Sequence, residues 1–129
     1  MTSIYIDFHI KSEKINVNLD SILGVKGKSH KINDISKTGI KLSYSEWNYC
    51  FDEKMTNEVN EVADQLFVDI ESKIGELQKY IHNSECLVSI YFVIRNYEKN
   101  EDYIYYDLSR DNIINFSKIN AEILFDGVS

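Results

Sequence analysis

Two histidines and two cysteines, His30, Cys50, His82 and Cys86, are of types that bind metals or act as nucleophiles and suggest a metal site. Structural zinc sites are usually recognised in a sequence by closely paired ligands such as C-x-x-C. His82 and Cys86 lie four positions apart, but the other two are isolated. A cysteine nucleophile would also need a base and backbone donors for an oxyanion, and neither cysteine has glycines beside it. We therefore expect no metal, no cofactor and no catalytic residues, and we interpret the protein as non-enzymatic.

The run GVKGK, residues 24–28, combines two glycines with two lysines and could suggest a phosphate-binding loop. It lacks the G-x-x-x-x-G-K-[ST] spacing, and it does not directly follow a strand. The whole stretch 25–39, VKGKSHKINDISKTG, has no hydrophobic periodicity. We predict an exposed, mobile loop there.

The charge of the chain argues against two classes of partner. The chain of 129 residues carries a net charge of -7, and the segment 52–85 alone has three Lys/Arg against nine Asp/Glu. Binding to nucleic acid or an anionic membrane surface requires clustered cations, so neither is expected as a partner.

The N-terminus, MTSIYIDFHI, has no signal-peptide pattern, and no apolar run approaches the ~20 residues of a membrane span. We expect a cytoplasmic protein in which Cys50 and Cys86 are reduced and buried.

The elements that would position these side chains follow from hydrophobic periodicity. Alternating apolar residues predict strands at 4–10, 40–51, 88–94, 103–106 and 121–127. Within 40–51 the alternation changes parity, which indicates a bulge near Ser45 and Glu46. The strands at 88–94 and 103–106 would form a hairpin through the charged turn NYEKNED.

Three helices complete the prediction. A short one, LDSIL, would be capped by Asn18 and ended by Gly24, and another would run from a cap at Ser109 to about Ile119, with Ile113, Phe116 and Ile119 on its apolar side. From Thr56 to Ile81 the period becomes 3.6, which predicts one long amphipathic helix capped by Thr56 or Asn57. The order βαβαββαβ predicts a single domain, 1–129, of α+β class. It would be a two-layer sandwich whose mixed or antiparallel sheet of about five strands is packed by one long and two short helices.

The flanks of the long helix carry its acidic residues: Glu58, Glu61, Asp64, Asp69, Glu71 and Glu76. Solvent-facing carboxylates on a helix are usually only a solvated surface. Trp47, the single tryptophan, alternates with Tyr49 and Phe51 and is interpreted first as a core anchor facing this helix. The alternative is that the aromatic strand and the acidic helix together form one interface, since aromatic residues are enriched at binding hot spots.

The succession of elements supports one resemblance. An N-terminal strand, a short helix ending in Leu-Gly, a loop, a strand with a single Trp, a long amphipathic helix and the closing segment DLSRDNIINFSKINAEILFDG together resemble an uncharacterised bacterial family, domain of unknown function 4279. The residues that match are Trp47 with Tyr49 two positions on, Leu108 with Ser109, and Asp126 near the end of the last strand. The proline often found after the Leu-Gly is absent, because this chain contains none. The resemblance implies a fold and a bacterial origin but no activity.

Two classes of function remain. The first is a protein-binding module, an immunity or antitoxin-like protein that neutralises a toxin, such as a basic nuclease, with its acidic and aromatic surface. Its partner-binding residues would be Glu58, Glu61, Asp64, Glu71, Trp47 and Tyr49. The second is a small-molecule-binding domain or an enzyme, with a pocket between sheet and helices lined by Tyr103, Tyr105, Trp47 or His9. A subunit that pairs its strand edge with its own copy is a third possibility.

Overall fold

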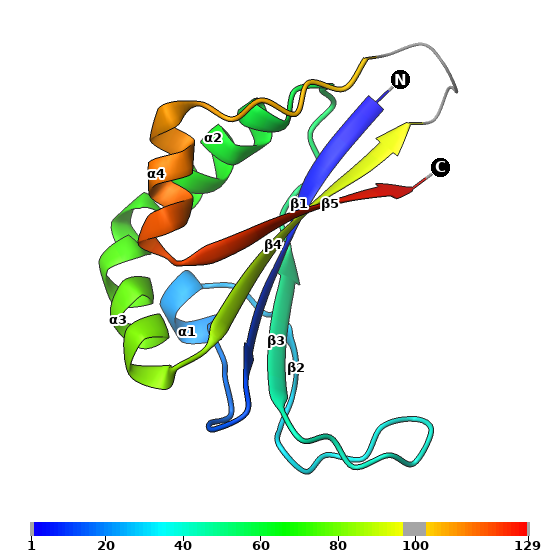
Figure 1. Cartoon of the computed structure of the whole chain (residues 1–129), viewed down its shortest axis with the longest axis vertical. Coiled ribbons are helices and arrows are strands. Elements are labelled where there is room, and N and C mark those ends of the chain that lie inside the picture. The colour runs from blue at the N-terminus through cyan, green and yellow to red at the C-terminus, as the bar shows by residue number, and fades with distance from the viewer. Residues whose placement is uncertain (1, 97–102, 129) are drawn as a thin grey trace.

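A computed structural model describes residues 2–96 and 103–128 (Figure 1). Its elements, in chain order, are β1 (Thr2–Ser12), α1 (Asp20–Leu23), β2 (Lys28–His30), β3 (Ser45–Cys50), α2 (Val59–Ile70), the 3₁₀ turn η1 (Glu71–Lys73), α3 (Ile74–Ser84), β4 (Leu87–Asn96), α4 (Arg110–Lys118) and β5 (Ala121–Val128).

The five strands form one open sheet in the order β2-β3-β1-β4-β5. The neighbours pair antiparallel except β4 and β5, which run parallel and are joined through α4. All the described helices lie on one side of the sheet (Figure 1). The α+β class, the mixed sheet and the combination of one long helix with two short ones are therefore confirmed.

The first strand shows how the sequence pattern creates the two faces. Along β1, the four alternating apolar residues of the prediction are fully buried beneath the helices, while the residues between them point to the opposite face. Neighbouring strands continue the buried side with Trp47, Val88, Ile90 and Phe92. One face of the sheet thus carries the core, and the other is left without a covering helix among the described residues.

The predicted long helix is present but begins at Val59 rather than Thr56, and η1 interrupts it. Its start is set by a neighbouring segment. The Val59 N–H donates to the Tyr105 carbonyl at 3.0 Å, and the Tyr105 N–H donates to the Asn57 carbonyl at 2.8 Å. Pairing with Tyr105 keeps Glu58 extended, so helical geometry begins only afterwards.

The same contacts correct the hairpin prediction. Residues 103–106 form no strand, and Tyr105 makes a single parallel bridge to Glu58. The strand β4 already has β1 on one edge and β5 on the other, so it has no free edge for a hairpin partner. The remainder of the predicted turn, 97–102, lies outside the described residues.

The fifth strand comes instead from the predicted loop. Residues 28–30 pair with β3 as β2, whereas the expected strand at 40–44 is absent. Residues 33–42 form an irregular antiparallel loop, in which Asn33 N–H donates to the Leu42 carbonyl and Ser36 N–H to the Ile40 carbonyl, each at 2.8 Å. The change of parity therefore marks the start of β3 at Ser45, and the predicted bulge is not needed.

The short helices keep most of their predicted ends. Gly24 ends α1 with a φ of 67°, a left-handed conformation, and Ser109 Oγ accepts from the Asn112 N–H at 3.2 Å at the start of α4. The apolar side of α4 departs from the prediction, because Ile113 is 54% exposed and Asn112 is buried. The expectation for the cysteines holds in part: both are free and Cys86 is buried, as predicted, but Cys50 is exposed.

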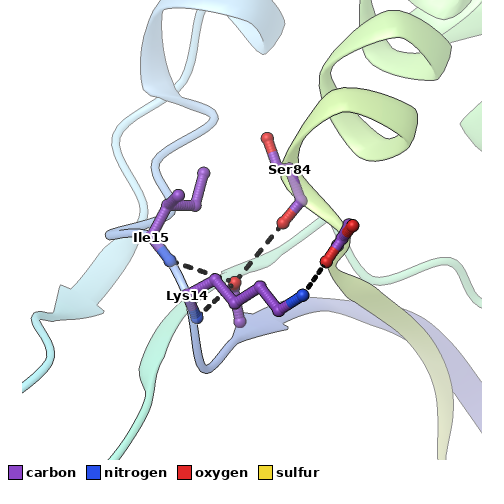
Figure 2. A network of polar contacts seen from close by, with 5 residues as sticks. Lys14, Ile15 and Ser84 are labelled. Atoms are coloured by element: carbon purple, nitrogen blue, oxygen red, sulfur yellow. Dashed lines mark hydrogen bonds and ion pairs between the residues drawn. The ribbon is translucent and has the colours of Figure 1, made fainter.

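The turn after β1 is tied to the end of α3 by a small polar network (Figure 2). Ser12 Oγ accepts from the N–H groups of Lys14 and Ile15 and donates to the Ser84 carbonyl at 3.5 Å. Lys14 also pairs with Glu85. Because Ser12 is buried, these contacts give its hydroxyl the hydrogen-bond partners that water would otherwise supply. None of the described helices is long and apolar enough to cross a membrane.

Candidate functional site

Trp47 lies wholly inside the core, as the anchor interpretation predicts. Its indole packs edge-on against Phe8, with ring centroids 6.2 Å apart, and is stacked 6.5 Å from Tyr49. The indole Nε1 donates to Asp20 Oδ1 at 2.7 Å. Tyr49 is partly buried and packs against the same core. The side chains of both aromatic residues therefore pack on the core side of β3, and Trp47 has no exposed surface that a partner could contact.

The acidic residues predicted as partner-binding separate into two groups on the long helix. Glu58 and Glu61 form the first group, close to Lys54, whose Nζ lies 3.7 Å from Glu61 Oε2. A hydrogen bond between the two carboxyl groups raises the pKa of Glu58 and lowers the pKa of Glu61. Thr56 adds to the lowering at Glu61. This group is an exposed, negatively charged cluster at the start of α2.

A hollow of about 380 Å³ lies beside this cluster, between α2 and the segment that follows β3. Its apolar lining comes from Ile6, Phe51, Val62 and Leu66. Its polar lining is Asp52, Glu53, Lys54, Gln65 and Asp69. Three of the five polar side chains are carboxylates and one is a cation, so the opening has a negative surplus.

The second acidic group consists of Asp64 and Glu71, and Asp64 takes part in a structural contact between two helices. Asn112 is buried and donates through Nδ2 to Asp64 Oδ1 at 2.7 Å and to Asn60 Oδ1 at 2.8 Å. Asn60 Oδ1 also accepts from the Ser109 N–H at 2.7 Å. Asp64 thus holds α4 against α2, and Glu71 lines a shallow hollow nearby that also contains Lys118. The structure does not bring Asp64 and Glu71 into the cluster of Glu58 and Glu61.

The uncovered face of the sheet holds a polar cluster that sequence reasoning missed. His9 lies between two carboxylates, with Nε2 3.0 Å from Asp7 Oδ2 and Nδ1 2.7 Å from Glu46 Oε1. Its ring meets Tyr91 edge-on at 5.0 Å. The hydrogen bond to Asp7 raises the pKa of His9, opposed by burial and assisted by Glu46. The pairing of Asp7 with His9 is visible as alternation along β1, but the contribution of Glu46 depends on the register of β3.

The same cluster does not activate the neighbouring thiol. Although Cys50 is exposed as a residue, partial desolvation of its thiol and the negative charge of Asp7 raise the pKa of Cys50, which keeps the sulfur protonated and weakly nucleophilic near neutral pH. Burial tends to raise the pKa of Asp7, but hydrogen bonds from His9 and Asn48 outweigh it and lower that pKa. The arrangement is that of an ion-paired histidine rather than of a cysteine nucleophile with its base.

The side chains considered for a metal are dispersed. Cys86 Sγ contacts the Ile81 carbonyl at 3.7 Å, while His30 lies on β2 and Cys50 on β3. Across residues 2–96 and 103–128 there is no group of three or more His, Cys, Asp or Glu side chains placed to hold a metal ion. The residues suggested for a ligand pocket are likewise apart, since Trp47 faces the core and His9 the opposite side of the sheet. The hollow that does lie between sheet and helix has a different lining.

Comparison with known proteins identifies the family to which the chain belongs. The family model described as a domain of unknown function (DUF4279) matches residues 2–128. Neither the curated proteins nor the solved structures contain a match to the chain. Because the match spans nearly the whole sequence, the chain belongs to the family of domains of unknown function DUF4279.

Proposed function

We propose that this protein is a non-enzymatic protein-binding module that neutralises a basic protein, in the manner of an immunity protein bound to its toxin. The observation that carries the proposal is the concentration of carboxylates around the hollow beside α2. Asp69 lines it from α2, and Asp52 and Glu53 line it from the preceding segment. Glu61 lies beside it through its ion pair with Lys54, and Glu58 is hydrogen-bonded to Glu61. An acidic surface of this kind favours a cationic partner and speeds its encounter.

A basic nuclease is the partner class that fits this charge best. Such an enzyme binds phosphates through clustered Lys and Arg side chains. Carboxylates presented on α2 would occupy those cations in place of the phosphates and so cover the substrate-binding surface. The apolar lining of the hollow would add desolvated contacts, which slow dissociation more than charge does.

The proposal is tested by co-purifying the tagged chain with the product of the reading frame immediately upstream, at low and at high salt. We expect a one-to-one complex that weakens at high salt, and a partner that is toxic when it is expressed alone and harmless when it is expressed together with this chain. A neighbour that neither binds nor harms the cell would overturn the immunity assignment.

The contribution of charge is measured separately on the purified complex. Neutralising Glu58, Glu61 and Asp69 to Gln, Gln and Asn should slow association about tenfold at low salt and reduce its salt dependence. The matched control neutralises Glu13, Glu76 and Glu122, which are exposed and outside the hollow. Equal effects of the two triple variants would mean that net charge acts without any role for this surface.

A small-molecule-binding function is the second candidate, because about 380 Å³ falls within the usual range of ligand pockets. A thermal-shift screen with metabolites and metal ions discriminates it. A ligand present at a hundredfold its Kd should add about 2.7 kcal/mol to the free energy of unfolding. A screen in which no compound raises the melting temperature would count against this candidate.

A further inference from the structure

The wall of the hollow beside α2 is fixed by backbone hydrogen bonds. Phe51 N–H donates to the Ile6 carbonyl at 2.8 Å, and Ile4 and Lys54 exchange two hydrogen bonds of 2.9 Å each. The segment from Phe51 to Lys54 is thereby held against β1, and α2 forms the opposite wall with Val62 and Leu66. The hollow is a feature of packed elements and does not depend on a loose loop.

Several of the polar groups around it are already engaged. Glu53 accepts a hydrogen bond from the Ser3 hydroxyl and lies 3.9 Å from Arg95 Nε. Lys54 is drawn towards Glu61. These contacts leave the remaining two carboxylates, Asp52 and Asp69, as the acceptors with the most free capacity.

Asp69 has one oxygen occupied, because Oδ1 accepts from Gln65 Nε2 at 2.9 Å. A carboxylate offers about four lone-pair sites, so most of the capacity of Asp69 is open. Asp52 is exposed and has no hydrogen bond or ion pair within the described part of the chain. Both line the hollow, beside an apolar surface formed by Phe51 and Leu66.

An apolar lining with carboxylates at the same opening suits one kind of occupant, a long aliphatic stem that ends in a cation. Arginine fits better than lysine, because the guanidinium is planar, more weakly hydrated and forked for carboxylate oxygens. The volume is at the low end for ligand pockets, which suits one side chain and is small for a nucleotide or a folded peptide. An anion is disfavoured by the surplus of carboxylates.

We propose that the hollow lined by Phe51, Asp52, Leu66 and Asp69 receives an arginine side chain of the basic protein partner. This inference rests on the proposed function for the identity of the partner, and it names the group that anchors it. The arginine stem packs on the apolar lining, and its guanidinium hydrogen-bonds the carboxylates of Asp52 and Asp69. A buried arginine in a pocket is the type of contact that dominates many protein interfaces.

The test requires no partner. The ¹⁵N-labelled full chain is titrated with Nα-acetylarginine amide and followed by its amide chemical shifts. We expect saturable shifts confined to residues 51–54 and 62–69, with a Kd of about 1–10 mM. The neutral isostere Nα-acetylcitrulline amide and the apolar Nα-acetylnorleucine amide should bind at least fivefold more weakly.

Two matched double variants sharpen the result. Neutralising Asp52 and Asp69 to Asn should weaken arginine amide binding at least fivefold, while neutralising Glu76 and Glu122 to Gln should leave it within twofold. Shifts that spread over the whole surface, or citrulline amide binding as tightly as arginine amide, would overturn the proposal. Tighter binding of Nα-acetyllysine amide would overturn the choice of arginine.

The outcome is separable from that of the proposed function. Saturable arginine binding together with a failed complex would retain the hollow as a cation site and remove the immunity role. A salt-sensitive complex without arginine binding would retain the acidic surface and remove the hollow as its anchor point.

Discussion

Trp47 and Asp20 are joined by a hydrogen bond of 2.7 Å from the indole Nε1 to Oδ1. The same carboxylate oxygen accepts from the Gly27 N–H at 2.9 Å. One acidic side chain at the start of α1 therefore holds both the buried tryptophan of β3 and the segment that leads into β2. This relationship explains how a tryptophan with a polar N–H can be fully buried without leaving that donor unpaired.

The close approach of Gly27 to this tryptophan is the first testable feature. A Cβ at position 27 would lie 2.3 Å from Trp47 Nε1, closer than atoms can pack. Gly27→Ala should therefore displace the indole or the loop, and we expect a loss of about 1–3 kcal/mol in the free energy of unfolding. Urea denaturation followed by Trp47 fluorescence measures it. The control is Gly75→Ala, at a helical position with open space and no left-handed backbone; a smaller loss for Gly27→Ala than for Gly75→Ala would contradict the assignment.

The Asp20 carboxylate should make stability depend on acid pH. Its hydrogen bond from the Gly27 N–H, followed by that from Trp47, lowers its pKa in the folded protein. The folded state then binds the proton less readily than the unfolded chain, so the stabilisation is present above the ordinary pKa of about 3.9 and is lost as pH falls through the lowered value. Unfolding curves from pH 7 to pH 2.5 should show a shallower acid decline for Asp20→Asn. The exposed Asp107→Asn should retain the decline of the unaltered chain.

Much of the fold was predictable because the residues of β1, the long helix and β4 repeat their apolar pattern over many positions. The 40–44 strand and the 103–106 strand were predicted wrongly, since a short alternating run fits a strand whether or not a sheet edge is free to receive it. Lys28–His30, in contrast, has no alternation to reveal it and becomes β2 through its pairing with β3. Sheet order is a long-range property, and local periodicity does not encode it.

Asn112 lies at the contact between α2 and α4, on a side of α4 that the periodicity did not predict to be buried. Ile113 was expected to face the core, yet Asn112 is the buried residue. Asn112→Leu would remove the donor to Asn60 and Asp64 and leave their oxygens partly unsatisfied, at a cost of about 1–3 kcal/mol. Ile113→Ala, at an exposed position, should change the free energy of unfolding by about 0.5 kcal/mol or less. Chemical denaturation of both variants decides which residue packs, and the reverse ranking would contradict the structure.

The candidate site was predicted only in part. Glu58 and Glu61 were named from their positions on the acidic side of the helix, and they do lie together near Lys54. The carboxylate of Asp52 was not named, because it belongs to no periodic element and reaches the hollow only through the pairing of Phe51 and Lys54 with β1. Asp64 was named for its charge, but its hydrogen bond from Asn112 gives it a structural role.

His9 supplies the last prediction, one of stability against alkaline pH. Its pKa is raised in the folded protein, first by the hydrogen bond to Asp7 and then by that to Glu46. Between the ordinary pKa of about 6.5 and the raised value, the folded chain holds a proton that the unfolded chain has released. The stabilisation is thus complete below about pH 6.5 and declines as pH rises through the folded pKa. We expect the free energy of unfolding to fall over this window in the unaltered chain and to fall less in His9→Gln, with the exposed His82→Gln as control.

An NMR titration of the His9 ring gives its pKa directly. A value at or below the ordinary pKa of about 6.5 would mean that the two neighbouring carboxylates do not hold the proton on His9 and that the uncovered face of the sheet carries no ion-paired histidine.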